Sequence, residues 1–133
     1  MAPHRLAIRV YYEDTDFSGV VYHANYLRFM ERGRTELLRD LGICQADLYT
    51  SGSEQPIAFA VTHMTIDFRK PARMDDLVTV ETELLSVGGA SLVLYQRLLR
   101  NDEVLADAKV KVAAMSCGRA ARVPAALAGK LAG

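Results

Sequence analysis

The chain has few cysteines, and this scarcity excludes several kinds of small protein. Its 133 residues include only Cys44 and Cys117, which lie far apart and outside any Cys-x-x-Cys pair. A disulfide framework or a dithiol redox motif is therefore not indicated. Half of the residues are hydrophobic, enough for one domain to bury its own core. We expect a single domain over residues 1–133, with an alanine-rich tail at 118–133, in a reducing, cytoplasmic compartment.

The chain also lacks an excess of charge of one sign. Its 16 Lys and Arg residues balance its 16 Asp and Glu residues, so no net field attracts nucleic acid or an anionic membrane surface. No apolar run approaches the ~18–20 residues that a membrane-spanning helix needs, and the start of the sequence lacks the pattern of a signal peptide. We predict no nucleic acid partner and no transmembrane segment.

The pattern of residues 24–41 predicts an amphipathic helix of about five turns. Apolar or small side chains recur there at steps of three and four, with charged residues between them. Gly42 follows directly and suits a left-handed cap at the end of the helix. Gly33 in mid-helix costs ~1 kcal/mol relative to alanine, which indicates that another backbone approaches the buried face closely.

Alternating apolar and polar residues predict strands on both sides of this helix. The first runs from Leu6 to Tyr12, and four more follow the helix at Ile57–Phe68, Leu77–Val87, Ser91–Arg100 and Val104–Ser116. Connections of hairpin length make this sheet antiparallel. Strands of about ten residues exceed the usual length, so we expect a long, curved sheet. The element order, with about five strands and one helix, is that of an α+β fold.

Three other features have mainly structural interpretations. Residues 48–56 are rich in turn formers and are either a lid or a plain connector. We expect His4 to be a mobile terminal residue and His63 to be a half-buried structural residue in its strand. Neither histidine has the neighbours that a metal site needs, so we predict no metal.

The segment between the first strand and the helix contains the residues best suited to chemistry. Asp16 precedes a turn at Gly19, and the helix begins near His23, seven residues after the carboxylate. The free N–H groups of a helix start stabilise negative charge. On spacing alone, an aspartate in Asp-x-x-Gly is more often a turn former than a catalyst, and His23 is a helix-start residue satisfied by backbone groups.

Residues 12–34 resemble the signature of hotdog-fold acyl-CoA thioesterases of the 4-hydroxybenzoyl-CoA type, and the Tol-Pal-associated branch is the most similar. The matching run begins Tyr-Glu-Asp-Thr-Asp-Phe-Ser-Gly-Val-Val-Tyr-His-Ala-Asn-Tyr. Residues 68–76 and 89–93 extend the resemblance. It implies a hotdog fold, with a long antiparallel sheet wrapped around one central helix, and no cofactor beyond the coenzyme A of the substrate. It also implies a homodimer, often paired again into a homotetramer, with active sites at subunit interfaces.

The resemblance further implies roles for individual residues in acyl-CoA hydrolysis. Asp16 would act as a nucleophile or as a general base, and the sequence leaves both open. The thioester oxygen would lie near the backbone N–H of His23, whose imidazole is a further catalytic candidate. Tyr22 and Asn25 are weaker candidates for contact with the substrate. Three basic residues are candidates for the phosphates of coenzyme A, or else are solvated surface charges: Arg69, Lys70 and Arg73.

Two other functions compete with hydrolysis. Acyl-thioester dehydratases and hydratases use the same fold, but the Pro-Gly-rich and Asn-Pro motifs expected of them are missing. A non-catalytic binding protein for acyl-CoA or an acyl carrier would keep the pocket without the chemistry. A carboxylate at Asp16 argues against this, because a pure binding site would desolvate it at a cost. Acyl carrier protein is kept as a candidate partner, and the preferred acyl chain and the pathway stay open.

Overall fold

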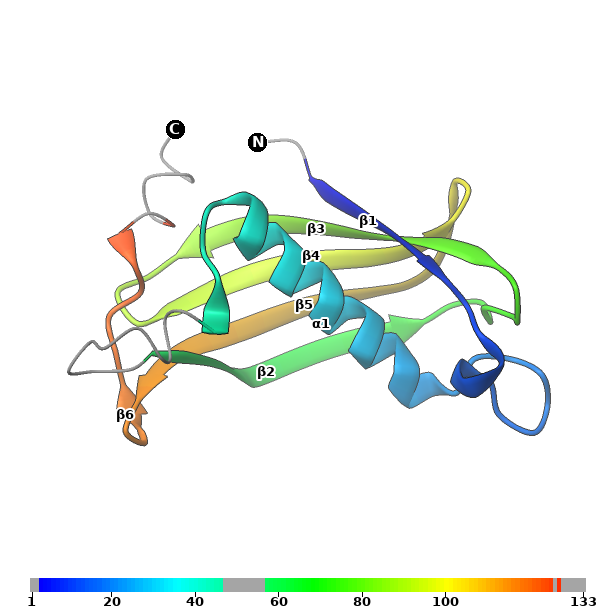
Figure 1. Ribbon diagram of the computed structural model, residues 1–133, viewed down its shortest axis with the longest axis horizontal. Coiled ribbons are helices and arrows are strands. Elements are labelled where there is room, and N and C mark those ends of the chain that lie inside the picture. The colour runs from blue at the N-terminus through cyan, green and yellow to red at the C-terminus, as the bar shows by residue number, and fades with distance from the viewer. Residues whose placement is uncertain (1–2, 47–56, 126, 128–133) are drawn as a thin grey trace.

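One long helix crosses a curved antiparallel sheet (Figure 1). The computed structural model describes residues 3–46, 57–125 and 127. Its elements are β1 (His4–Arg9), η1 (Tyr12–Asp14), α1 (His23–Asp40), β2 (Ala58–Phe68), β3 (Leu77–Val87), β4 (Ser91–Arg100), β5 (Glu103–Ser116) and β6 (Arg119–Ala120). The strand order is β1-β3-β4-β5-β2, with β6 beside β5. The predicted α+β class and the predicted sheet around one helix are confirmed.

The strands after the helix match their predicted positions closely. The bounds of β2, β3, β4 and β5 each agree with prediction to within one residue at either end. Asn101 has φ 55° in the turn between β4 and β5, a left-handed conformation that asparagine tolerates. The turn-forming residues of the sequence therefore predicted the positions of the hairpins correctly.

The two ends of the chain differ from prediction. β1 ends at Arg9 because the chain then turns into η1, where Tyr12 is 81% exposed instead of lying on the apolar face of a strand. At the other end, β6 was not predicted, and Val123 and Leu127 are buried in the core. The first part of the alanine-rich tail thus belongs to the domain. Within the described residues, no helix is long and apolar enough to span a membrane.

Both histidines outside the motif were interpreted wrongly. His4 is a strand residue that pairs with Thr82, and its Nε2 atom lies 2.9 Å from Asp40 Oδ2 at the end of α1. We had predicted a mobile His4 because it lies near the start of the sequence. Its pairing with β3 and its contact with Asp40 hold it in place instead. His63 is exposed, beside a break in the β2 register after Val61. The predicted loop at 48–56 lies outside the described residues.

The predicted cap at the end of α1 is confirmed. Gly42 has φ 85°, and its N–H donates to the carbonyl of Arg39 at 3.0 Å. The N–H of Ile43 donates to the carbonyl of Leu38 at 2.8 Å. This pair of bonds is a Schellman motif, which satisfies carbonyl groups that the helix leaves free.

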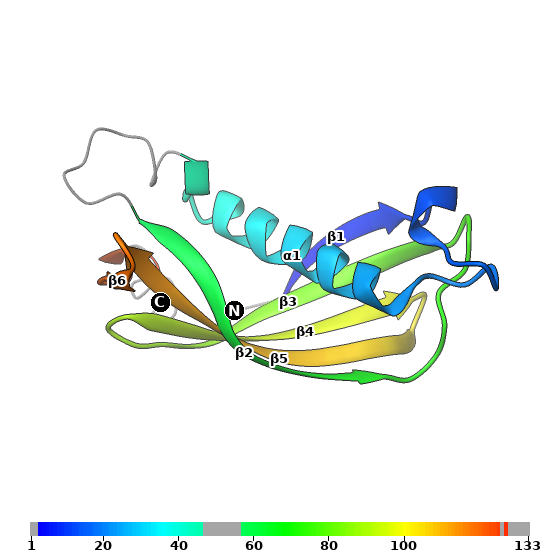
Figure 2. The ribbon, with the colours of Figure 1, turned by 90° about the horizontal axis from the view of Figure 1, so that it is seen from below.

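Close contact between α1 and the sheet explains Gly33. A β-carbon at this position would lie 2.5 Å from Val80 Cγ1 and 2.9 Å from Thr82 Oγ1, so no larger residue fits without movement. The buried residues of α1 are Tyr26, Phe29, Met30, Gly33, Leu37 and Leu38. Figure 2 shows the helix lying along one side of the curved sheet. This packing holds the start of α1 at a defined place beside the sheet.

Candidate functional site

Asp16 lies in a tight hairpin between η1 and α1. Thr15 and Val21 form a bridge, and the N–H of Asp16 donates to the carbonyl of Val20 at 2.9 Å. The N–H of Gly19 donates to the carbonyl of Asp16 at 3.1 Å, and Gly19 has φ 84°. A turn followed by a left-handed glycine is typical of three-residue hairpin loops. The backbone of Asp16 is therefore fixed by its own loop.

Ser18 holds one oxygen of the Asp16 carboxylate. Its N–H donates to Asp16 Oδ1 at 2.8 Å and its hydroxyl donates to the same atom at 2.6 Å. Within the described residues, Asp16 Oδ2 receives no hydrogen bond. The hydroxyl of Ser18, and then its N–H, hold the pKa of Asp16 below the ordinary value of an aspartate. Asp16 is thus an exposed carboxylate that stays ionised at neutral pH.

Ser18 was not predicted from the sequence as a site residue. A signal for it existed, because the side chain of an aspartate in a turn commonly accepts the N–H of the residue two positions later. The additional bond from the hydroxyl depends on the rotamer of Ser18, and the sequence does not specify a rotamer.

The carbonyl of Asp14 connects this hairpin to the start of α1. It accepts the N–H of Tyr22 at 3.0 Å and the side-chain Nδ2 of Asn25 at 2.8 Å. The first N–H groups of the helix, those of His23 and Ala24, donate to no acceptor among the described residues. They stand at the positive end of the helix dipole. The carboxylate hairpin and a helix start with free donors are therefore held together by one backbone group.

Tyr26 ties the helix start to the turn after β2. Its hydroxyl accepts the N–H of Ala72 at 2.8 Å and donates to the carbonyl of Lys70 at 3.4 Å. The N–H of Val21 also donates to the carbonyl of Ala72, at 2.8 Å. In the sequence, Tyr26 was only a position on the buried face of the helix. The structure adds a polar role, since its hydroxyl anchors a chain segment beside the site.

A groove of about 270 Å³ opens at the helix start. It is lined by Val21, His23, Tyr26, Phe68, Arg69, Lys70 and Pro71. The imidazole of His23 meets the ring of Phe68 edge-on, with 6.1 Å between the centroids, and Tyr22 lies on its other side at 4.5 Å. No hydrogen bond joins this imidazole to Asp16 in the part of the chain that is described. His23 thus lines the groove, and its ring packs against Phe68 and Tyr22.

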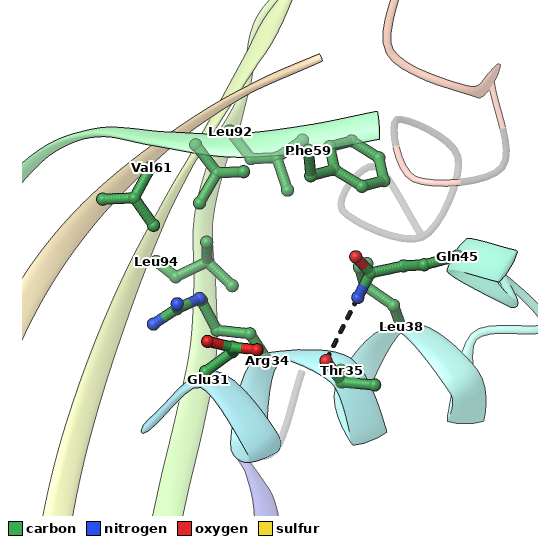
Figure 3. Close-up of a pocket in the computed structure, with 10 residues that line it drawn as sticks. Glu31, Arg34, Thr35, Leu38, Gln45, Phe59, Val61, Leu92 and Leu94 are labelled. Carbon is green, nitrogen blue, oxygen red and sulfur yellow. Dashed lines mark hydrogen bonds between the residues drawn. The ribbon is translucent and has the colours of Figure 1, made fainter. Parts of the chain in front are cut away.

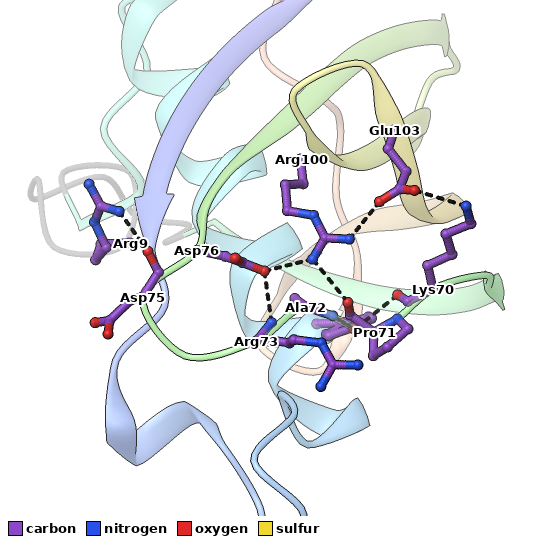
Figure 4. Close-up of polar contacts among 10 residues, drawn as sticks. Arg9, Lys70, Pro71, Ala72, Arg73, Asp75, Asp76, Arg100 and Glu103 are labelled. Atoms are coloured by element: carbon purple, nitrogen blue, oxygen red, sulfur yellow. Dashed lines mark hydrogen bonds and ion pairs between the residues drawn. The ribbon is translucent and has the colours of Figure 1, made fainter.

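The predicted phosphate contacts differ in availability, as Figure 4 shows for Lys70 and Arg73. Arg69 forms two bonds to the carboxylate of Asp107, at 3.2 and 3.1 Å, which raise the pKa of Arg69. Lys70 Nζ lies 2.8 Å from Glu103 Oε2. The guanidinium of Arg73 makes no ion pair with any described residue. As far as the described residues show, Arg73 is therefore the cation of this turn without an acidic partner, whereas the other two face acids from β5.

The chain is similar to known thioesterases in both sequence and structure. A profile of the thioesterase superfamily matches residues 18–106. The chain is 51% identical to "Acyl-CoA thioesterase YbgC" of Haemophilus influenzae over 84% of this chain and 80% of that protein. It is 46% identical to "Acyl-CoA thioester hydrolase YbgC" of Escherichia coli O157:H7 over 76% of this chain and 72% of that protein.

A solved structure agrees with these matches. The crystal structure of a probable thioesterase from Bartonella henselae superposes with a TM-score of 0.89 and 43% sequence identity. The superposition covers 92% of this chain and all of that one. The predicted hotdog fold is confirmed by this superposition and by the arrangement of the helix and sheet. Among the described residues, no group of His, Cys, Asp and Glu side chains is arranged to hold a metal ion.

Proposed function

Because the chain belongs to the thioesterase superfamily, we propose that it hydrolyses acyl-CoA to a free acid and coenzyme A, with Asp16 as the catalytic carboxylate. The proposal is supported mainly by the hydrogen bonds of the Asp14 carbonyl, which accepts from Tyr22 and Asn25 and so joins the Asp16 hairpin to the start of α1. A thioester carbon is electrophilic and its thiolate leaves readily. A carboxylate and an oxyanion donor are therefore enough for hydrolysis.

Two mechanisms use the same groups. As a nucleophile, Asp16 Oδ2 attacks the thioester carbon, coenzyme A leaves as a thiolate, and water hydrolyses the resulting mixed anhydride. As a general base, Asp16 takes a proton from water, whose oxygen attacks the same carbon. In both, negative charge develops on the carbonyl oxygen, and the N–H of His23 stabilises it. The imidazole of His23 borders the groove and can orient the attacking water.

We assign the substrate contacts according to what each side chain already binds. Arg73 meets a phosphate of coenzyme A most readily, since Arg69 and Lys70 must first leave their acidic partners. Tyr22 is half exposed next to His23 and provides a wall for the substrate. Asn25 acts indirectly, through its bond to Asp14. No cofactor takes part in this scheme.

The enzyme's activity is tested by measuring thiol release from short-chain, long-chain and aromatic acyl-CoAs with the whole protein. Release from any of them supports the proposal and identifies the acyl class. Binding of acyl-CoA without release contradicts it and favours a non-catalytic binding protein. Hydration of an enoyl-CoA without thiol release favours the dehydratase or hydratase alternative.

We propose that the protein is a homodimer joined along β2. Among the described residues this strand pairs only with β5, so its other edge carries backbone groups that no described strand pairs with. Val61 and Phe68 of β2 are also exposed. Sedimentation equilibrium should return a mass of two protomers, or of four if dimers pair again. A monomer at all concentrations would contradict the proposal.

The resemblance also supports a cytoplasmic location, acyl carrier protein as an alternative acyl donor, and work alongside the Tol-Pal system.

Removal of the Ser18 hydroxyl should move the acid limb of the pH profile. Ser18→Ala deletes the largest cause of the lowered Asp16 pKa and keeps the N–H bond. The Asp16 pKa then rises towards its ordinary value, so the active carboxylate is lost at a higher pH as the solution is acidified. kcat/KM measured from mildly acidic pH downwards checks this shift. An unchanged acid limb would show that the hydroxyl does not control the ionisation of Asp16.

A further inference from the structure

A second cavity lies between α1 and the part of β2 farther from the helix start (Figure 3). Its volume is about 280 Å³. The strands contribute an apolar wall of Phe59, Val61, Leu92, Leu94 and Val112, and the opposite side carries Glu31, Arg34, Thr35, Leu38 and Gln45. The volume is slightly below the ~300–1,000 Å³ of most small-molecule sites, and the lining is typical of them, with a few polar groups among mainly apolar side chains.

Arg34 is the unusual residue of this cavity. Its Nη1 donates to Gln96 Oε1 at 3.0 Å, and the other guanidinium N–H groups donate to no described residue. Gln96 is fully buried, and its Nε2 donates to the carbonyl of Met30 at 2.8 Å and to Thr82 Oγ1 at 2.9 Å. These bonds fix the amide with its oxygen towards Arg34. One end of the guanidinium is therefore anchored, while its remaining donors are free.

The charge of Arg34 is poorly compensated. Burial lowers its pKa, and the nearest opposing charge, Glu31, is exposed at the rim and forms no ion pair with it in the described part of the chain. A partly desolvated cation without a bonded acid is costly in a folded protein. A ligand oxygen that accepts its free N–H groups would remove much of this cost.

The cavity and the proposed active site are lined by the same two elements. α1 and β2 flank both: Tyr26 and Phe68 line the groove at the helix start, and Arg34 and Val61 line this cavity. Arg34 follows His23 by eleven residues, a distance of about 17 Å along the helix axis. Long helical side chains lean towards the helix N-terminus, so the guanidinium extends from its backbone towards His23.

Resting on the proposed function, we propose that this cavity receives the far end of the acyl group and that Arg34 selects acyl groups with an oxygen acceptor there. The acceptor is either a carboxylate, as in the half-thioester of a dicarboxylic acid, or a hydroxyl. Glu31 should affect these two acceptors in opposite ways. Its carboxylate repels a ligand carboxylate, whereas it can accept a hydrogen bond from a ligand hydroxyl.

The test compares three acyl-CoAs of equal chain length: octanoyl-CoA, octanedioyl-CoA and omega-hydroxyoctanoyl-CoA. In the wild type, kcat/KM for at least one oxygen-bearing substrate should exceed that for octanoyl-CoA about tenfold, the effect of one charge-assisted hydrogen bond. Arg34→Met should abolish this preference, and Arg34→Lys should retain part of it. Octanoyl-CoA turnover by each variant serves as the control for an intact site.

Arg34→Gln provides a second variant, because it keeps a polar side chain with N–H donors while the charge is gone. It should lose the preference as Arg34→Met does. Glu31→Gln should increase turnover of octanedioyl-CoA if a carboxylate is the acceptor, and decrease turnover of the hydroxy substrate if a hydroxyl is.

Two results would overturn the inference: equal wild-type turnover of all three substrates, or a preference that survives Arg34→Met. Both leave hydrolysis itself standing. A wild-type protein that hydrolyses none of the three, nor any other acyl-CoA, would instead refute the proposed function.

Discussion

Asp16→Asn is expected to lower kcat/KM for acyl-CoA hydrolysis by about a thousandfold or more, the range seen when a positioned acid or base is removed. An amide neither attacks a thioester carbon nor takes a proton from water at neutral pH. Its oxygen can still accept both bonds from Ser18, so the hairpin should keep its shape. Steady-state thiol release, compared at matched oligomeric state, measures the loss.

Asp75→Asn is a suitable control for this substitution. Asp75 is likewise an exposed aspartate in a turn, with φ 70°, a conformation that asparagine also adopts. Its backbone carbonyl accepts a bond from Arg9, and the substitution leaves that carbonyl in place. We expect wild-type turnover from Asp75→Asn. Wild-type turnover from Asp16→Asn as well would remove Asp16 from the mechanism.

His23→Pro is expected to lower kcat by about a hundredfold to a thousandfold, the cost of losing one oxyanion donor. Proline deletes the backbone N–H and is well tolerated at the first position of a helix. The preceding residue, Tyr22, already has φ −62° and ψ 133°, which a following proline allows. The substitution therefore removes the donor with little strain on α1, and circular dichroism can verify that the helix persists.

His23→Ala isolates the side chain from the backbone. It removes the imidazole and its contact with Phe68 but keeps the N–H, so we expect a much smaller loss of kcat than with His23→Pro. Equal losses from the two variants would assign the role to the imidazole and would contradict an oxyanion site at this N–H.

The local sequence pattern was sufficient to predict the positions of most helices and strands of this fold. The strands β2 to β5 were predicted from alternation and turn residues, and α1 from its apolar spacing and Gly42. Such signals depend on neighbours within a few residues, which the sequence displays directly. β1 was less accurate, because the position where a strand ends depends on when its partner, here β3, stops pairing with it.

Local sequence also accounts for part of the arrangement of the candidate site residues. Asp16 and His23 are seven positions apart in the sequence, and a single hairpin separates them, so local structure determines how the chain runs from one to the other. The roles of Arg69 and Lys70 did not follow, since their acidic partners, Asp107 and Glu103, are more than thirty positions away in sequence. Only pairing between β2 and β5 brings these charges together.

The sequence by itself determined the helix, the hairpins and the acid before the helix start, because short-range propensity and turn chemistry specify each of them. It also required a close neighbour for Gly33. Only the tertiary structure decided which strands supply that neighbour and which acids the described residues place beside Arg69 and Lys70. It also decided that Arg34, a residue lining an apolar cavity, binds Gln96. These depend on contacts between residues distant in the chain, whose partners are chosen by the packing of the whole sheet against α1.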